Sequence, residues 1–427
     1  MKIAIWHNLP SGGGKRALYQ QVKGLLARGH TIEAWCPETA AIDYLPLRHM
    51  VQEHVLPFAW PEVLRRVKWE GFSAAAIVGA ARKLARKATS FDALAQHGLA
   101  CARQINEGGF DVLLAHPCAV MFAPYIGRET RLPSVLYLQE PNRMLYEALP
   151  SLPWKAPRPF RAGSNHVQSL CERIEDLLRV HYLRLQAREE HDNAAAFDAI
   201  LVNSCFSRES TLRAYGLDSS VCYLGVDTSL FRPIDAVGKG TYIITVGSIN
   251  PLKNTMFLLR AIRCIKRGRP TLVCVANGYD PEYRDAVIRY ASENDIAIDI
   301  KVNVPDSELV ELYNGALFAI YAPRLEPFGY VTLEANACRI PVVATAEGGA
   351  RETIVDQGNG LLVAPEPESM AAGIGRLLSD ERLRMALGTR GLADVEQRWT
   401  LAHATERLEH RLYEAVAART PGASVNG

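Results

Sequence analysis

The sequence lacks a long apolar run, a paired-cysteine motif and a large excess of either charge. No uninterrupted apolar stretch approaches the ~20 residues that a membrane-spanning helix needs. The nine cysteines are odd in number and never spaced as Cys-x-x-Cys, which argues against a disulfide framework and against a zinc site. A formal net charge of +2 argues against a nucleic-acid binder that relies on overall basicity. We therefore expect no metal and no nucleic-acid partner.

The N-terminus also lacks the pattern of a secretion signal. Met1 and Lys2 lead directly into a β-rich run at residues 3–6 and then into glycines. We therefore expect a cytoplasmic protein. One basic stretch, residues 61–90, carries seven basic and two acidic residues with interleaved apolar ones. It could lie on the inner, anionic face of a membrane as a peripheral contact, or it could be a solvated helix face.

Length and periodicity predict two domains of α/β type. A single core stops growing near ~250–300 residues, and this chain has 427. Short β-rich runs alternate with helical patterns, as in parallel sheets with crossover helices. The expected strands are residues 2–6, 31–36, 111–115, 134–138 and 199–203, and then 242–246, 271–276, 298–302, 318–321 and 341–344.

Residues 231–240 contain proline and glycine with little periodicity, which is typical of an interdomain linker. We predict a first domain at 1–232, a second at 233–400, and a C-terminal helix and tail at 401–427 that could cross back to the first. Two doubly wound, Rossmann-like domains facing each other would place the carboxyl ends of both sheets around a central cleft, where ligands of such sheets bind.

Three loops carry candidate binding residues. Gly12, Gly13 and Gly14 follow the first expected strand and precede a helix, which suits a phosphate but is also compatible with a plain turn. Gly247 opens a second strand-to-helix loop, in which Lys253 is either an anion ligand or an exposed lysine.

The third loop is the most informative because it carries two glutamates near one helix face. Glu326 precedes the expected helix and Glu334 lies about two turns along it. A carboxylate accepts two hydroxyl hydrogen bonds, so Glu334 suits a ribose diol and Glu326 a hexose hydroxyl. The alternative is a solvated pair of helix glutamates, although the helix is unusually apolar for that. Gly329 would leave nearby backbone amides open to a ligand.

Taken together, these residues resemble glycosyltransferase family 4. The resemblance covers nearly the whole chain and is strongest from 200 to 365. It rests on the Glu326 to Glu334 spacing and on similar residues at 28–30, 202–207, 215–216, 225–233, 340–344, 347–352 and 358–363.

The resemblance implies a GT-B fold, with a sugar nucleotide bound mainly by the second domain and an acceptor mainly by the first. It implies a retaining, metal-independent hexosyltransferase of polysaccharide or glycolipid biosynthesis, with no cofactor besides the sugar-nucleotide co-substrate. Carried over to this chain, Lys253 would neutralise the diphosphate, Glu326 would hold the transferred sugar and Glu334 the ribose. The remaining donor-binding residues would be Gly12, Gly13, Gly14, Gly247, Ser248, Phe328, Gly329 and Tyr330.

Three positions depart from the family pattern. Ser248 stands where an arginine is usual, Gln139 where a histidine is frequent, and Lys15 where an acidic residue is common. An alternative is therefore a binding protein of the same fold without turnover, or a GT-B epimerase. Possible acceptor or sugar contacts are His116, Gln139, Glu140 and Arg143. His116 could equally be a structural histidine.

Residues 139–143 are similar to those of mannosyltransferase-like members. GDP-mannose is therefore the first donor expected, followed by UDP-glucose or UDP-N-acetylglucosamine. The acceptor would be a hydroxyl of a glycan, a lipid-linked molecule or a small molecule.

Overall fold

The computed structural model describes residues 1–57, 74–148, 152, 154–155 and 166–419, and for residues 74–89, 166–172 and 175 it describes the backbone alone. It contains two parallel sheets in two compact units. The first unit comprises residues 1–202, 210–220 and 409–427, and the second comprises residues 203–209 and 221–408. Compared with the predicted limits, residues 203–209, 221–232 and 401–408 group with the second unit, and residues 409–427 with the first.

The first unit has a seven-stranded sheet in the order β3-β2-β1-β4-β5-β6-β7, and its pairs from β3 to β6 are parallel. Its strands are β1 (Lys2–Asn8), β2 (Thr31–Pro37), β3 (Gln52–Leu56), β4 (Val112–Cys118), β5 (Ser134–Gln139), β6 (Ala199–Val202) and β7 (Ser220–Val221). Its helices are α1 (Gly13–Ala27), η1 (Leu47–His49), α2 (Ala74–Glu107), α3 (Ile126–Glu129), α4 (Arg143–Tyr146) and α5 (His166–Ala195).

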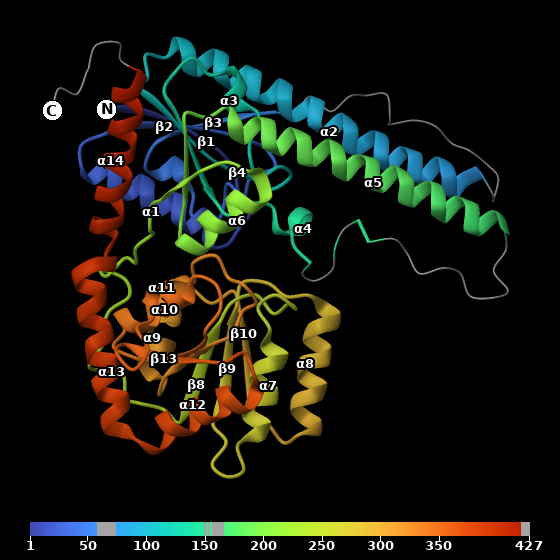
Figure 1. The fold of residues 1–427 in the computed structure, drawn as a ribbon. Coiled ribbons are helices and arrows are strands. Elements are labelled where there is room, and N and C mark those ends of the chain that lie inside the picture. The colour runs from blue at the N-terminus through green and yellow to red at the C-terminus, as the bar shows by residue number, and fades with distance from the viewer. Residues whose placement is uncertain (58–73, 149–151, 153, 156–165, 420–427) are drawn as a thin grey trace. The chain divides into compact units, whose positions relative to one another are not determined.

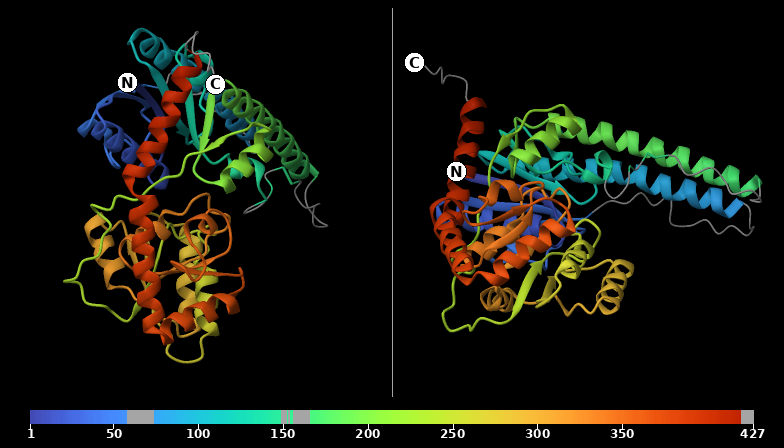
Figure 2. Two further views of the ribbon diagram at one scale, coloured as in Figure 1. Left: turned by 60° about the vertical axis from the view of Figure 1, so that its left-hand side comes forward. Right: turned by 60° about the horizontal axis from the view of Figure 1, so that its bottom comes forward.

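The two long helices α2 and α5 lie side by side, and they remain neighbours in every view (Figures 1 and 2). Residues 58–73 lie outside the described residues, as do the side chains up to residue 89. The membrane contact predicted for residues 61–90 therefore stays a prediction. No helix in the described part of the chain combines the length and the apolar character needed to cross a membrane.

The second unit has a six-stranded parallel sheet in the order β10-β9-β8-β11-β12-β13. Its strands are β8 (Tyr242–Val246), β9 (Thr271–Ala276), β10 (Ile298–Val302), β11 (Ala319–Tyr321), β12 (Val342–Thr345) and β13 (Gly360–Val363). Its helices are α7 (Thr255–Cys264), α8 (Pro281–Glu293), α9 (Asp306–Gly315), α10 (Tyr330–Ala337), α11 (Ala350–Thr353), α12 (Pro367–Ser379), α13 (Glu381–Asp394) and the π-helix η3 (Val395–Trp399).

Two further helices contribute residues to both units. Helix α6 (Cys205–Tyr215) passes from the second unit to the first between residues 209 and 210, and α14 (Leu401–Arg419) does so between 408 and 409. The local sequence explains where α8 begins. Asp280 accepts a hydrogen bond from the Tyr283 amide, and Pro281 begins α8, which is the usual chemistry of a capped helix.

The predicted class, two α/β domains with parallel sheets, is confirmed. Each predicted strand matches an observed one to within a few residues at its ends, whereas β3, β7 and β13 were not predicted. Because the strands are parallel, the loops at their carboxyl ends meet along one edge of each sheet. The candidate residues of the first unit lie after β1, near the end of β4, and at or after the end of β5, and those of the second unit follow β8 and β11.

Candidate functional site

The centre of the candidate site in the second unit is an ion pair between Lys253 and Glu326. The Lys253 Nζ atom donates to both carboxylate oxygens of Glu326, at 2.8 and 2.7 Å. Lys253 belongs to the loop between β8 and α7, and Glu326 to the loop between β11 and α10. The structure therefore brings together the two residues that the sequence predicted to bind the diphosphate and the transferred sugar.

Backbone contacts hold these two loops against each other. The Arg324 amide donates to the Leu252 carbonyl at 2.8 Å, and the Asn254 side chain donates to the Ala322 carbonyl at 3.1 Å. Gly247 opens the first loop with φ +147, a backbone conformation that favours glycine. The Lys253 ammonium is thus placed by two loops and not by the reach of a flexible side chain alone.

A turn containing two glycines fixes the backbone around Glu326. The Gly349 amide donates to the Glu326 carbonyl at 2.7 Å. A Cβ atom on Gly348 would collide with the Glu326 backbone, and one on Gly349 with the Pro327 carbonyl. Both positions therefore exclude a side chain. A hydrogen bond from outside these loops also holds this segment, because the Ser204 hydroxyl donates to the Pro327 carbonyl at 2.5 Å.

Glu334 lies on α10 and is 5% exposed. Its Oε2 atom accepts a hydrogen bond of 2.9 Å from the Tyr313 hydroxyl. Burial, together with the Glu334 charge, raises the pKa of Tyr313 well above its ordinary value, so this hydroxyl stays protonated and donates. The carboxylate is held in one orientation by a residue of α9 that the sequence did not single out.

The other predicted donor residues of the second unit lie in the same two loops or at the start of α10. Ser248 donates to the Asn277 side chain at 2.8 Å, so its hydroxyl is oriented by a residue that follows β9. Phe328 is buried and packs edge-on against Tyr330, with ring centroids 5.6 Å apart. Gly329 adopts φ +89 at the start of α10. The side chain of Phe328 therefore packs in the interior of the unit. Its backbone amide is the part of the residue that is suited to contact a ligand.

In the first unit, Gln139 lies against the glycine loop. A Cβ atom on Gly14 would approach the Gln139 amide group to 3.3 Å, and Gly12 precedes α1 with φ +137. Gln139 itself has φ +65, which is strained for a residue other than glycine. Within the described part of the chain its buried Nε2 atom has no hydrogen-bond partner. Backbone strain and an unpaired amide are features that often mark binding sites.

The other predicted acceptor contacts differ in their surroundings. Arg143 forms ion pairs with Glu140 at 3.7 Å and with Glu147 at 3.0 Å. His116 is fully buried and stacks on Tyr137, with ring centroids 5.6 Å apart. Burial lowers the pKa of His116 to about 3. Within the described residues neither ring nitrogen of His116 has a hydrogen-bond partner, so both roles that the sequence left open, a structural histidine and an acceptor contact, remain predictions.

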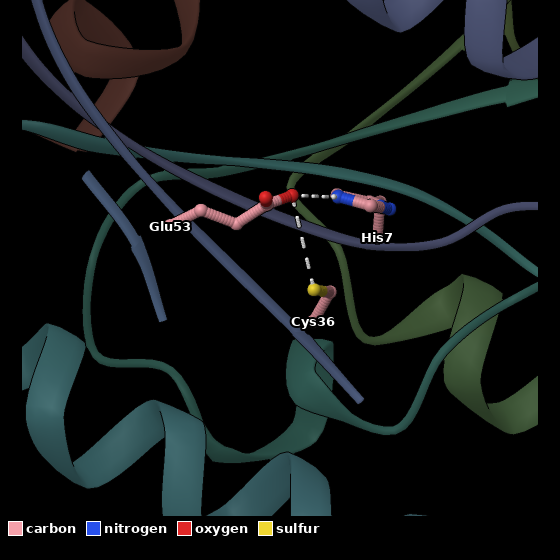
Figure 3. A group of neighbouring side chains, drawn as sticks. All are labelled: His7, Cys36 and Glu53. Carbon is pink, nitrogen blue, oxygen red and sulfur yellow. Dashed lines mark hydrogen bonds and ion pairs between the residues drawn. The ribbon is translucent and has the colours of Figure 1, made fainter. Parts of the chain in front are cut away.

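Three neighbouring polar side chains, His7, Cys36 and Glu53, lie on the adjacent strands β1, β2 and β3 (Figure 3). The Glu53 carboxylate is 3.6 Å from the His7 ring nitrogen and 4.0 Å from the Cys36 sulfur. Such residues can ligate a metal. However, the Lys15 ammonium, 3.5 Å from His7 Nε2, already balances the Glu53 charge. Burial also raises the pKa of Cys36 to about 12, which keeps the thiol protonated.

Comparison with known proteins then identifies the second unit. Residues 227–393 match the family described as glycosyl transferases group 1. These residues form a glycosyl transferases group 1 domain. The D-inositol 3-phosphate glycosyltransferase of Frankia alni is 35% identical over 40% of this chain and 47% of its own length. The human alpha-1,3/1,6-mannosyltransferase ALG2 is 26% identical over 56% of this chain and 64% of its own.

A third relative is the GDP-mannose-dependent alpha-(1-6)-phosphatidylinositol monomannoside mannosyltransferase of Mycolicibacterium smegmatis. It is 29% identical over 45% of this chain and 56% of its own length. The matched part of the chain thus spans about half the length of these curated relatives.

Solved structures extend the likeness to almost the whole chain. HepE of Anabaena, solved with UDP and glucose, has a TM-score of 0.67 at 18% identity and covers 97% of this chain and 99% of its own. Sucrose-phosphate synthase of Thermosynechococcus elongatus has a TM-score of 0.67 at 16% identity and covers 98% of this chain and 100% of its own. At these identities the likeness shows the fold alone, and that fold is GT-B, as predicted.

Within the group 1 domain, the sequence missed the residues that support the predicted ones. Tyr313, Asn277 and Gly349 contact Glu334, Ser248 and Glu326 across gaps of 21, 29 and 23 positions. Of these supporting residues, only Gly349 could be noticed in the sequence. Together with Gly348 it belongs to residues 347–352, which resemble the family but were given no role. The predicted roles of all site residues remain predictions.

Proposed function

We propose that the protein is a retaining glycosyltransferase that moves a hexosyl group from a nucleoside diphosphate sugar to a hydroxyl acceptor. The observation that carries this proposal is the Lys253–Glu326 pair at the carboxyl ends of β8 and β11, inside a group 1 domain. It joins a cation suited to a diphosphate with a carboxylate suited to sugar hydroxyls. The predicted ribose ligand, Glu334, follows on the adjoining helix.

The chemistry of glycosyl transfer agrees with these roles. Breaking the glycosyl phosphate bond builds negative charge on the departing diphosphate and positive charge on the sugar. The Lys253 ammonium and the amino end of α10 would stabilise the first, and the Glu326 carboxylate would accept hydrogen bonds from the sugar. In this proposal the protein needs neither a metal nor a cofactor, because the Lys253 ammonium and the dipole of α10 stabilise the negative charge of the departing diphosphate.

GDP-mannose is the donor we propose first, because two of the relatives are named as mannosyltransferases, one of them GDP-mannose-dependent. UDP-glucose and UDP-N-acetylglucosamine follow. The test is release of nucleoside diphosphate from these three donors, with a panel of methyl glycosides as acceptor probes and with EDTA present throughout. We expect release with one donor and an α-linked product by NMR. Binding without release would favour an inert binding protein, and an epimerised donor would favour an epimerase.

Contact with a membrane and a cytoplasmic location are separate proposals. The charge excess of residues 61–90 supports the first. Co-sedimentation with liposomes should then occur with anionic lipid and not with neutral lipid. Equal sedimentation with both would contradict a charge-driven contact.

Replacing Glu334 with alanine is expected to weaken nucleotide binding by about 1–3 kcal/mol, because a ribose diol would lose two hydrogen bonds to a carboxylate. Isothermal titration with the preferred nucleoside diphosphate measures the change. Tyr313→Phe should weaken binding less, because the carboxylate stays and loses one orienting bond. Glu311→Ala, at an exposed position of α9, is the control and should bind as the wild type. Unchanged affinity in Glu334→Ala would remove the ribose role.

A further inference from the structure

The first unit contains a fully buried carboxylate with no assigned role. Glu190 lies on α5 and is 0% exposed. Its Oε1 atom accepts hydrogen bonds from the side-chain amides of Asn142 and Gln186, both at 2.9 Å. Its Oε2 atom accepts one from the Tyr215 hydroxyl at 3.1 Å, and the Phe122 backbone also donates to the carboxylate. All four of these partners are uncharged.

These partners come from four separate pieces of the chain. Phe122 belongs to the loop after β4, Asn142 to the loop after β5, Gln186 to α5 itself and Tyr215 to α6. Helix α5 makes two more contacts with the loop after β4, because Gln186 donates to the Val120 carbonyl and Asn193 to the Ala123 carbonyl. A single carboxylate therefore joins both loops at the carboxyl edge of the sheet to two helices.

Burying such a carboxylate is costly. A buried ion without a cation loses several kcal/mol of hydration, and accordingly burial raises the pKa of Glu190, against the opposing effect of its hydrogen bonds. Apolar side chains would fill the same space without that cost. Apolar side chains could not, however, hold the hydrogen-bond donors of separate loops in one arrangement. A buried polar network can do so.

Asn142 links this network to the candidate acceptor residues. It lies in the same loop as Gln139, Glu140 and Arg143, and its carbonyl accepts the Leu145 and Tyr146 amides at the start of α4. Within the described residues its side-chain oxygen has no partner, and its side-chain nitrogen donates to Glu190. Fixing Asn142 therefore fixes the backbone from which Gln139 and Arg143 extend.

We infer that Glu190 is a positioning residue for acceptor binding, which holds the loop 139–143 in place through Asn142. This inference rests on the proposed function for its link to the acceptor. It assigns Glu190 no contact with either substrate. A loosened loop should therefore impair use of the acceptor while the donor site in the second unit remains intact.

The test compares two variants that each remove one hydrogen bond from the same carboxylate. Asn142→Ala cuts the side-chain bond to the loop, and Gln186→Leu cuts the bond from α5 to the carboxylate together with a bond to the Val120 carbonyl, while the contacts of residues 139–143 stay in place. In hydrogen exchange followed by mass spectrometry, peptides covering residues 140–147 should exchange at least fivefold faster in Asn142→Ala. They should change less than twofold in Gln186→Leu. Should Asn142→Ala not fold, Asn142→Ser serves in its place.

Kinetics with a methyl glycoside as acceptor probe provide the functional half of the test. Asn142→Ala should raise the KM for the glycoside at least tenfold, and should leave both the KM for the donor and the rate of donor hydrolysis within twofold. Faster exchange without this split would restrict Glu190 to a structural role. Unchanged exchange in Asn142→Ala, or an equal rise in Gln186→Leu, would overturn the inference. If the wild type transfers sugar to no probe, the proposed function fails and exchange still decides whether Glu190 holds the loop.

Discussion

Glutamine in place of Glu326 is expected to slow sugar transfer strongly and to tighten the binding of free nucleoside diphosphate. In the structure the Lys253 ammonium is engaged by both oxygens of Glu326, so a diphosphate must compete with that carboxylate for the lysine. A partly exposed ion pair is worth up to about 1 kcal/mol, so its loss should improve the diphosphate affinity by roughly threefold to fivefold. Transfer should fall by about 100-fold or more, because the carboxylate proposed to hold the sugar in the transition state is lost.

The opposite signs of the two effects make this experiment informative. Titration calorimetry measures diphosphate binding, and release of nucleoside diphosphate measures turnover. Lys253→Ala should lower both quantities, since the cation itself is removed. Glu347→Gln is the matched control, because Glu347 lies in a neighbouring loop and pairs with Arg324, at 3.7 Å, and not with Lys253. Weaker binding of the diphosphate to Glu326→Gln would mean that the carboxylate does not compete for Lys253.

The sequence predicted the elements and each of the two residues of the central ion pair, though not their pairing, because both the elements and the residues depend on local signals. The predicted bounds of β8 and β9 are the same as the observed ones, because short apolar runs bounded by turn residues identify buried parallel strands. Lys253 and Glu326 lie 73 positions apart, yet each occupies a loop that follows a strand of the same parallel sheet. The topology of such a sheet brings these loops to one edge.

The supporting residues were not predictable in the same way. Strand β3 begins with three consecutive polar residues, Gln52, Glu53 and His54, so its apolar signal is weak, although the Glu53 side chain is only 3% exposed. The Lys15 charge, which departs from the family pattern, is balanced by Glu53 from that unpredicted strand. Glu190 likewise sits in a charged run of α5, where a solvated surface is the usual expectation. Buried charges of this kind are identified by their partners, which only the fold brings together.

Acidification from pH 6.5 to 5 is expected to destabilise the first unit by about 2 kcal/mol for each of two buried histidines. Burial lowers the pKa of His7 to about 4 and that of His116 to about 3. In the unfolded chain both would bind a proton near pH 6.5, whereas in the folded chain both stay neutral at pH 5. The stability that these residues contribute above pH 6.5 is therefore lost progressively as the pH falls toward their folded values. Urea unfolding at several pH values, followed by tryptophan fluorescence, measures the slope.

A variant isolates this effect from other titrating groups. His116→Phe keeps an aromatic ring against Tyr137 and removes the proton-binding nitrogens, so it should lower the pH slope by about half of the histidine contribution. His191→Gln alters an exposed histidine on α5 and should leave the slope as it is in the wild type. Glu190 acts with the opposite sign, because its pKa is raised on folding, and it contributes equally to the wild type and to both variants. The difference in slope between His116→Phe and the wild type therefore reports on His116 alone, and equal slopes would show that its ring is hydrated or protonated in the folded protein.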